Sequence, residues 1–173
     1  MIYGIQGMSY VFKMMGSPVG QLTLIASASG LAAVLWENEK PNRVLLSAVR
    51  EALENPVLLA TERQLGEYFA GTRKRFELDL DFVGTEFQCK VWQALFTIPF
   101  GETRSYSDIA RQIGCPKAVR AVGAANGKNP ISVIVPCHRV IGASGSLTGY
   151  AGGLAAKQFL LALEGRQTLA LGF

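Results

Sequence analysis

Three short apolar runs near the start of the chain are separated by turn-forming residues. They cover Ser9–Met14, Leu22–Ala28 and Leu31–Trp36, with turn segments at Gly16-Ser17-Pro18 and Ser27-Ala28-Ser29-Gly30. Apolar runs of this length, bounded by Gly, Pro and Ser, are typical of strands joined by tight turns. The pattern therefore predicts an antiparallel meander.

Two helices and one further strand are predicted in the rest of the first half. The helices cover Asn42–Leu53, with Asn42 as N-cap, and Thr61–Ala70, with Gly71 where a glycine commonly ends a helix. Residues 76–81 alternate apolar and acidic side chains, which predicts a half-exposed strand. No pattern here suggests catalysis, so we expect residues 1–83 to form a small α/β scaffolding domain.

The second predicted domain, residues 84–173, opens with a helix-start pattern. A boundary is predicted near Asp81–Gly84, and Thr85-Glu86-Phe87-Gln88 then has the form of a capping box, in which side chains satisfy free amides of the first turn. The helix that follows is expected to end before Pro99 and to contain Cys89 as a small buried hydrophobe. Its core-facing residues are predicted to be Val91, Trp92 and Leu95.

Residues 103–129 have helix-turn-helix form. A helix over Ser107–Ile113 is broken by Gly114-Cys115-Pro116, and a second helix over Lys117–Asn126 ends at Gly127. Helical spacing predicts that one face of the second helix packs on the core: Ala118, Ala121, Val122 and Ala125. The opposite face is basic with little bulk, which suits close approach to another molecule's backbone: Lys117, Arg120, Gly123, Ala124 and Lys128. An ordinary packed helix pair is the alternative, because such patterns are loose.

A last helix is predicted over Leu154–Leu163, entered through Gly152-Gly153 and ended by Gly165. Glu164 would then lie at the C-terminal end of this helix, where the helix dipole disfavours a negative charge by a few tenths to ~1 kcal/mol. A carboxylate at an unfavourable position suggests that a partner holds it there. An exposed glutamate without consequence is the alternative.

Composition excludes several classes of protein. Apolar residues make up 49% and charged residues 17%, which excludes a disordered chain. No stretch reaches the ~18 apolar residues of a membrane span, and the first twelve residues show no basic cluster of a secretory signal. Three widely spaced cysteines and one histidine do not form a zinc-binding pattern. We expect a reduced, cytoplasmic protein without a metal.

Charge is distributed unevenly along the chain. Residues 1–84 hold 8 basic and 9 acidic side chains, and residues 85–173 hold 9 basic and 4 acidic ones. The stretch from Arg104 to Arg139 contains six basic residues and one acidic residue, Asp108. This basic stretch is either a solvated face or a nucleic-acid contact surface, and it surrounds the candidate site described next.

The only histidine, His138, directly follows Cys137 at the end of an apolar segment. A cysteine with its ordinary pKa of ~8.5 is a weak nucleophile, which an adjacent base or positive charge activates. His138 is the candidate base and Arg139 adds positive field, but successive residues of a strand point to opposite faces. Either Pro136 begins a turn that brings the side chains together, or a water relays the proton. A buried thiol beside a surface histidine is the alternative without chemistry.

Residues 134–140, Ile-Val-Pro-Cys-His-Arg-Val, resemble the active-site signature (I/V-P-C-H-R-V/I) of the O6-alkylguanine-DNA alkyltransferases, in particular the bacterial constitutive type. The similarity extends from about Thr85 to Gly165, whereas the first 84 residues match only in general layout. Its further motifs are Phe100-Gly101-Glu102, Ser105-Tyr106, Arg120-Ala121-Val122-Gly123, Asn129-Pro130, Tyr150, Gly152-Gly153, and Leu160-Leu161 before Glu164-Gly165.

The resemblance implies a small RNase H-like α/β domain followed by a mainly α, winged-helix-like DNA-binding domain. It implies a methylated-DNA–protein-cysteine S-methyltransferase that works once, without a cofactor, on double-stranded DNA with alkylated bases. The substrates would be O6-alkylguanine and O4-methylthymine, reached by minor-groove binding and nucleotide flipping. A monomer that does not engage membranes is expected.

The resemblance also implies roles for individual residues. Cys137 would accept the alkyl group, His138 would deprotonate it through a water, Glu164 would hold the histidine, and Asn129 would brace the turn. Tyr106 would rotate the target nucleotide and protonate the departing guanine, and Arg120 would fill the vacated stack. Further DNA contacts are expected from Lys117, Ala121, Gly123 and Lys128. The base pocket is expected to comprise Tyr106, Val135, Pro136, Tyr150 and Ala151.

Some features depart from the family pattern. Ala151 stands where some members have serine, and the zinc ligands of some relatives have no counterpart, because the chain has one histidine. Alkyltransferase-like proteins lack the cysteine, whereas position 137 keeps it, so activity is expected. Two other hypotheses remain at this point: a multiple-turnover Cys-His hydrolase, and a DNA-binding protein without chemistry.

Overall fold

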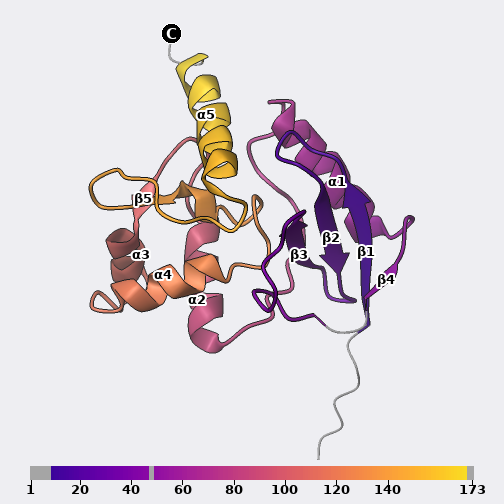
Figure 1. Ribbon diagram of the computed structural model, residues 1–173, viewed down its shortest axis with the longest axis horizontal. Coiled ribbons are helices and arrows are strands. Elements are labelled where there is room, and N and C mark those ends of the chain that lie inside the picture. Colours follow the sequence, from indigo (N-terminus) through magenta and orange to yellow (C-terminus); the bar gives the residue numbers. More distant parts are fainter. Residues whose placement is uncertain (1–8, 47–48, 171–173) are drawn as a thin grey trace, which may run out of the picture.

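The computed structural model of this protein describes residues 9–46 and 49–170, with side chains as far as residue 165. A small sheet with one long helix makes up the N-terminal half, and the C-terminal half is mostly helical (Figure 1). This arrangement confirms the predicted fold class, whereas the division between residues 83 and 84 stays a prediction. No helix in the described ranges is long and apolar enough to cross a membrane.

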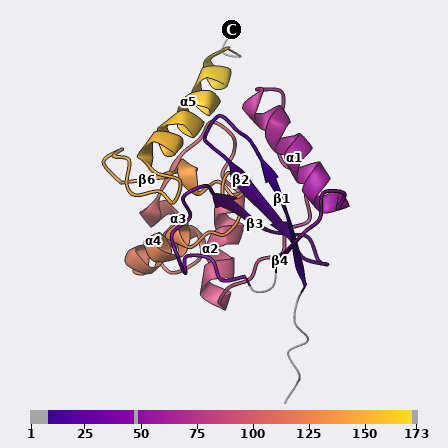
Figure 2. The ribbon, with the colours of Figure 1, turned by 45° about the vertical axis from the view of Figure 1, so that its right-hand side comes forward.

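The sheet contains β1 (Tyr10–Met15), β2 (Leu22–Ala26), β3 (Leu31–Trp36) and β4 (Val49–Glu51), in the spatial order β3-β2-β1-β4. The first three strands pair antiparallel in chain order, so the predicted meander is confirmed, and β4 joins β1 in parallel. Helix α1 (Pro56–Phe69) packs along one face of this sheet (Figure 2). The core between them forms because the buried side chains of β2, β3 and α1 point at one another.

The helix predicted over Asn42–Leu53 is wrong. Residues 41–46 form turns and irregular backbone, residues 47 and 48 lie outside the described part of the chain, and Val49–Glu51 is a strand. Asn42 has a φ of 62°, a left-handed conformation, whereas an N-cap residue has an extended one. Strand β4 occupies the free edge of β1, and the Ala52 amide donates to the Phe12 carbonyl at 2.9 Å. Pairing with this edge outweighs the local helical pattern.

Helix α1 begins at Pro56 rather than at the predicted Thr61. Asn55 caps it, because its Oδ1 accepts two amide hydrogen bonds of the first turn at 3.0 and 3.2 Å. The predicted end is confirmed: Gly71 follows the helix with a φ of 81°, as a terminating glycine requires.

Two isolated bridges join later segments to the outer strand β3. Residues 76–81 show the predicted alternation of exposure. They do not form a regular strand, because only Leu80 pairs with the sheet, through a bridge to Leu31. Ile131 bridges to Val34, whose amide donates to the Pro130 carbonyl at 2.9 Å. The second bridge ties the segment that leads to Cys137 onto the N-terminal sheet.

The C-terminal half starts with α2 (Glu86–Phe96), which has the predicted capping box. Helices α3 (Tyr106–Gln112) and α4 (Val119–Gly127) form the predicted helix-turn-helix. The two short strands β5 (Arg104–Ser105) and β6 (Val140–Ile141) pair in parallel beside them. Trp92 of α2 donates its indole N–H to the Ala125 carbonyl of α4 at 2.8 Å, which joins α2 to the helix pair.

Helix α4 begins at Val119 rather than at the predicted Lys117, and two of the four residues expected on its core face are not buried: Ala118 precedes the helix and is half-buried. Val122 and Ala125 are buried, but Ala121 is exposed, so its expected packing on the core is wrong. Asn126 is buried instead. The buried residues lie three and four positions after Val122, which places them on the same face of the helix. Ala121 therefore belongs to the outer face of the helix.

The last helix, α5 (Leu154–Ala170), continues through Gly165, so its predicted end there is wrong. Glu164 lies inside the helix, and the helix-dipole argument for it fails. Lys157, Leu160 and Glu164 are all fully buried, and their spacing of three and four residues places them on one inward face. Packing of this face sustains the helix past a glycine that costs ~1 kcal/mol in a helix interior.

Candidate active site

A turn brings Cys137 and His138 off the extended path that would separate them. Residues Cys137–Arg139 form one turn of 3-10 helix directly after Pro136. Both side chains are buried, with residue exposures of 3% for Cys137 and 0% for His138. No hydrogen bond joins the thiol to the imidazole among the described residues, so the turn buries both groups without bonding them directly.

The imidazole of His138 is held by Glu164. The distance from Nε2 to Oε1 is 2.8 Å, and both groups are inaccessible to solvent. Burial holds the pKa of His138 below its ordinary value, so the ring is neutral. The N–H at Nε2 donates a hydrogen bond to the carboxylate. Nδ1 then carries a free lone pair, and this buried atom has no hydrogen-bond partner in the described part of the chain. The ring is therefore set up to accept a proton at Nδ1.

Glu164 is surrounded by donors from separate segments. Tyr68 of α1 donates its hydroxyl to Oε1 at 2.7 Å, and Arg139 donates from Nη2 to Oε1 and from Nε to Oε2, both at 2.9 Å. Burial alone would raise the pKa of Glu164, but the bonds from His138 and Arg139 outweigh it and lower that pKa to about 2. Glu164 is thus a permanent buried anion at neutral pH.

Two of these donors were not identified from the sequence in this role. Tyr68 belongs to the half expected to be a scaffold, and burial together with the charge of Glu164 raises its pKa, so the phenol keeps its proton. Arg139, predicted only to add positive field, is buried and also donates to the Ile98 carbonyl at 2.6 Å. Nothing in the sequence pairs Tyr68 with Glu164, because 96 residues separate them.

Asn129 spans the segment that precedes the thiol. Its side-chain amide donates to the Val135 carbonyl at 2.9 Å, and its Oδ1 accepts from the Ile131 amide at 3.0 Å. Between them the buried Val133 has a φ of 71°, a conformation that costs a β-branched residue on the order of 1–3 kcal/mol. The two bonds of Asn129 hold this strained segment closed.

The thiol of Cys137 is protonated in this environment. Burial raises its pKa, against opposing contributions from the Asn129 amide and the positive charges of Arg43 and Lys157. Arg43, from the N-terminal half, donates to the Asn129 carbonyl at 2.7 Å, and Lys157 of α5 donates to the Val140 carbonyl at 2.7 Å. Sequence reasoning missed both cations. A buried neutral thiol needs a base before it can act as a nucleophile.

The base pocket stays a prediction, and its expected residues differ in burial. Val135 and Pro136 directly precede Cys137 in the chain and are buried, and Ala151 is half-buried. The Tyr150 hydroxyl is buried and has no hydrogen-bond partner among the described residues. The Tyr150 ring packs edge-on against Trp36 at 5.5 Å, and a side chain at Gly152 would meet the Trp36 ring at 2.6 Å, so position 152 needs glycine.

Three of the residues expected to contact DNA are exposed cations: Lys117, Arg120 and Lys128. Arg120 makes no hydrogen bond or ion pair within the described residues, whereas the Lys128 ammonium donates to the Asn42 carbonyl at 3.4 Å. A Cβ at Gly123 would lie 3.9 Å from the Tyr106 ring, so α4 passes close to that tyrosine. Tyr106 is half-buried and its hydroxyl lies 2.6 Å from that of Thr148.

No group of three or more His, Cys, Asp or Glu side chains among the described residues could hold a metal ion. The candidate site contains a thiol, an imidazole and a carboxylate supplied by the chain itself. This arrangement provides a protonated nucleophile, a base with a free lone pair, and an anion that can stabilise the imidazolium.

Comparison with known proteins gives a consistent result over most of the chain. Residues 10–82 match the model of the "6-O-methylguanine DNA methyltransferase, ribonuclease-like domain" and residues 86–166 that of the "6-O-methylguanine DNA methyltransferase, DNA binding domain". The methylated-DNA–protein-cysteine methyltransferase of Mycolicibacterium paratuberculosis is 52% identical over 160 residues, which are 92% of this chain and 94% of that protein. The constitutive methylated-DNA–protein-cysteine methyltransferase of Bacillus subtilis is 58% identical over 115 residues, which are 66% of this chain and 70% of that protein.

A solved structure agrees with these matches. The crystal structure of Mycobacterium tuberculosis OGT in complex with DNA superposes with a TM-score of 0.82 and 48% identity. The superposition covers 92% of this chain and 94% of that one.

Replacing Tyr68 by Phe should lower the free energy of unfolding by about 1.5–3 kcal/mol, because a buried carboxylate loses a charge-assisted hydrogen bond while the ring is kept. Urea denaturation measures the loss. In a Glu164→Gln background the same change should cost less than ~1 kcal/mol, as the coupling between contacting residues disappears. Equal losses in both backgrounds would contradict the contact between hydroxyl and carboxylate.

Acid should remove the contribution of Glu164 to stability. Its pKa is lowered from 4.5 to about 2 in the folded protein, so its stabilisation is fully present above pH ~4.5 and is lost as the pH falls toward 2. The loss should be on the order of 3 kcal/mol. Denaturant midpoints measured down this pH range should fall more steeply for the natural protein than for Glu164→Gln. Parallel curves for the two proteins would show that Glu164 does not carry this dependence.

Proposed function

The chain belongs to the 6-O-methylguanine DNA methyltransferase family, and from that premise we propose that it repairs DNA by moving an alkyl group from O6-alkylguanine in duplex DNA to the thiolate of Cys137. The observation that carries this proposal is the pairing of a buried, protonated thiol with a histidine whose Nδ1 is free. Glu164 bonds the opposite nitrogen of that histidine.

The reaction begins with proton removal from Cys137. A water passes the thiol proton to Nδ1 of His138, and Glu164 stabilises the resulting imidazolium through Nε2. The thiolate then attacks the alkyl carbon, the bond from that carbon to O6 breaks, and the bonding electrons stay on the guanine. Tyr106 donates a proton to the departing base. Because a thioether has no easy leaving path, each molecule reacts once. The reaction needs no cofactor, since the thiolate itself accepts the alkyl group.

Access to the thiol requires the target base to leave the duplex. Cys137 is 3% exposed, so an alkylated base within a stacked helix could not reach it. The flipped base would enter a pocket formed by Tyr106, Val135, Pro136, Tyr150 and Ala151, while Asn129 keeps the turn in place. A pocket of this kind would also admit O4-methylthymine.

DNA would bind through α4. Its outer face carries the exposed Arg120 together with the small residues Ala121 and Gly123, which allow a groove wall to come close, and the exposed Lys117 and Lys128 flank the helix. We place this face in the minor groove, with Lys117 and Lys128 at the phosphates. Arg120, exposed and without an internal partner, would occupy the gap left by the flipped nucleotide. The protein would act as a monomer.

Intact-mass spectrometry after mixing with a duplex that contains one O6-methylguanine tests the function. We expect every active molecule to gain one methyl group, mapped to Cys137 by peptide analysis, with no further turnover. Cys137→Ala should still bind the duplex but gain nothing, while Cys89→Ala serves as the matched control and should be methylated normally. Unmodified protein, or methyl on another residue, would refute the proposal; turnover without modification would favour a hydrolase.

Replacing Arg120 by Ala should slow repair of duplex DNA on the order of 10- to 100-fold, because the flipped state loses the side chain that offsets unstacking. Reaction with free O6-benzylguanine should stay within about twofold, since no duplex is opened. Single-turnover rates on both substrates measure the difference, and Arg63→Ala on α1 is the exposed-arginine control. Similar losses on both substrates would exclude the role of Arg120 in the stack.

A further inference from the structure

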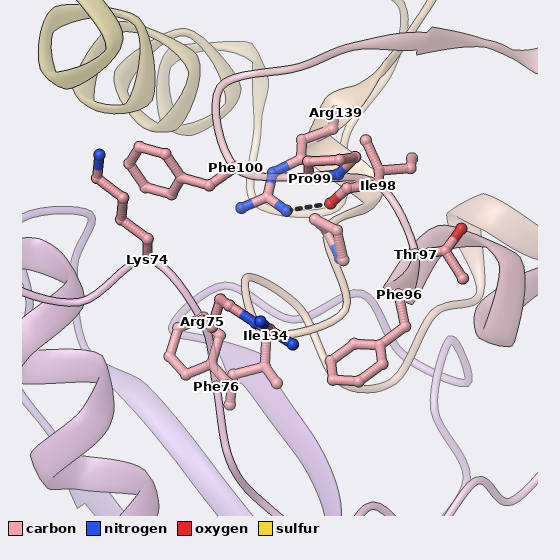
Figure 3. Close-up of a pocket in the computed structure, with 11 residues that line it drawn as sticks. Lys74, Arg75, Phe76, Phe96, Thr97, Ile98, Pro99, Phe100, Ile134 and Arg139 are labelled. Atoms are coloured by element: carbon pink, nitrogen blue, oxygen red, sulfur yellow. Dashed lines mark hydrogen bonds between the residues drawn. The ribbon is translucent and has the colours of Figure 1, made fainter. Parts of the chain in front are cut away.

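A cavity of about 560 Å³ lies beside the active-site turn, and Cys137 does not line it (Figure 3). It is enclosed by residues 74–76 of the N-terminal half, by residues 96–100 at and after the end of α2, and by parts of the segment 134–139. Its volume falls in the range of about 300–1,000 Å³ that is usual for small-molecule sites. The proposed proton transfer from Cys137 to His138 does not use this cavity, and neither does the proposed DNA-contact face of α4.

Three phenylalanine rings line part of the cavity. Phe76 belongs to the N-terminal half, and Phe96 and Phe100 belong to the segment at and after the end of α2, as Figure 3 shows. The Phe100 ring already contacts Lys74 and Arg139, at 5.5 and 5.7 Å from its centroid, whereas Phe96 is 42% exposed although it is a large apolar side chain. An exposed aromatic ring at a cavity favours a flat, unsaturated group that can stack on it.

The charged groups of the cavity are all positive. Lys74, Arg75 and Arg139 line it, and no Asp or Glu does. Arg139 is buried, and its charge is matched by Glu164 while it also donates to the Ile98 carbonyl, so it holds one wall of the cavity in place. Lys74 lies over the Phe100 ring at 5.5 Å, and neither it nor Arg75 has a side-chain hydrogen bond or ion pair within the described residues. Two cations at the rim are therefore available to an anion.

We propose that this cavity binds a mononucleotide, with its base against the Phe96 ring and its phosphate at Lys74 and Arg75. The exposed ring provides stacking and the free cations provide charge complementarity to a phosphate dianion. An aliphatic anion would leave the Phe96 ring without a stacking partner, and a neutral aromatic compound would leave the two cations unused. The Cys137 thiol does not line this site.

Binding of 2′-deoxyguanosine 5′-monophosphate to the full-length protein tests this, followed by methyl NMR of the isoleucines. Ile98 and Ile134 line the cavity and should shift in a saturable manner, while Ile109 in α3 should not. Deoxyguanosine and inorganic phosphate should each bind at least about tenfold more weakly, because each satisfies only half of the site.

Variants assign the site to its residues. Lys74→Gln combined with Arg75→Gln should weaken nucleotide binding at least about tenfold, and since both residues are exposed the fold should be kept. Phe96→Ala should weaken it similarly, and Lys90→Gln, an exposed lysine on α2, is the matched control that should change nothing. Shifts confined to the helix-turn-helix, no saturable shift, or full affinity in the double variant would each overturn the proposal. Equal affinity for inorganic phosphate would reduce the site to an anion site and refute its nucleotide specificity.

Discussion

The carboxylate of Glu164 carries a negative charge where water cannot reach it, and the arrangement of four segments depends on matching that charge. Tyr68 approaches from α1, His138 and Arg139 from the active-site turn, and the Gly101 amide, at 3.4 Å, from the loop after α2. An unmatched buried charge costs several kcal/mol, so each donor that moves away destabilises the rest. The same contacts that hold the fold together also fix the histidine tautomer.

At Cys137, unlike at Glu164, burial outweighs the neighbouring charges and keeps the group neutral. Burial keeps Cys137 protonated, while nearby cations and the Asn129 amide favour the thiolate without prevailing. A nucleophile that is used once benefits from this balance, because a thiol kept neutral until a base acts is protected from side reactions. Arg43, Trp36 and Tyr68, all from the N-terminal half, touch this site or its supports. That half is therefore more than the scaffold expected from its sequence.

The parts of the fold that were predicted correctly depend on local patterns. The meander, the capping box at Thr85 and the helix-turn-helix could be identified because strand alternation, capping and helical spacing involve residues close in sequence. Two of the errors arise from contacts between distant parts of the chain. Strand β4 follows from pairing with β1, and the continuation of α5 past Gly165 follows from an inward face packed on distant residues. Local propensity is weak enough for such tertiary contacts to override it.

For the site, the sequence by itself determined which groups are present: one histidine next to a cysteine, a proline directly before them, and a predicted helix with basic and small residues. Only the tertiary structure decided how those groups work. It placed Glu164 within a helix and against His138, added Tyr68 and Arg139 as its donors, and left Nδ1 free. The physical reason is that hydrogen bonding and burial depend on distances between residues far apart in the chain, which no local pattern encodes.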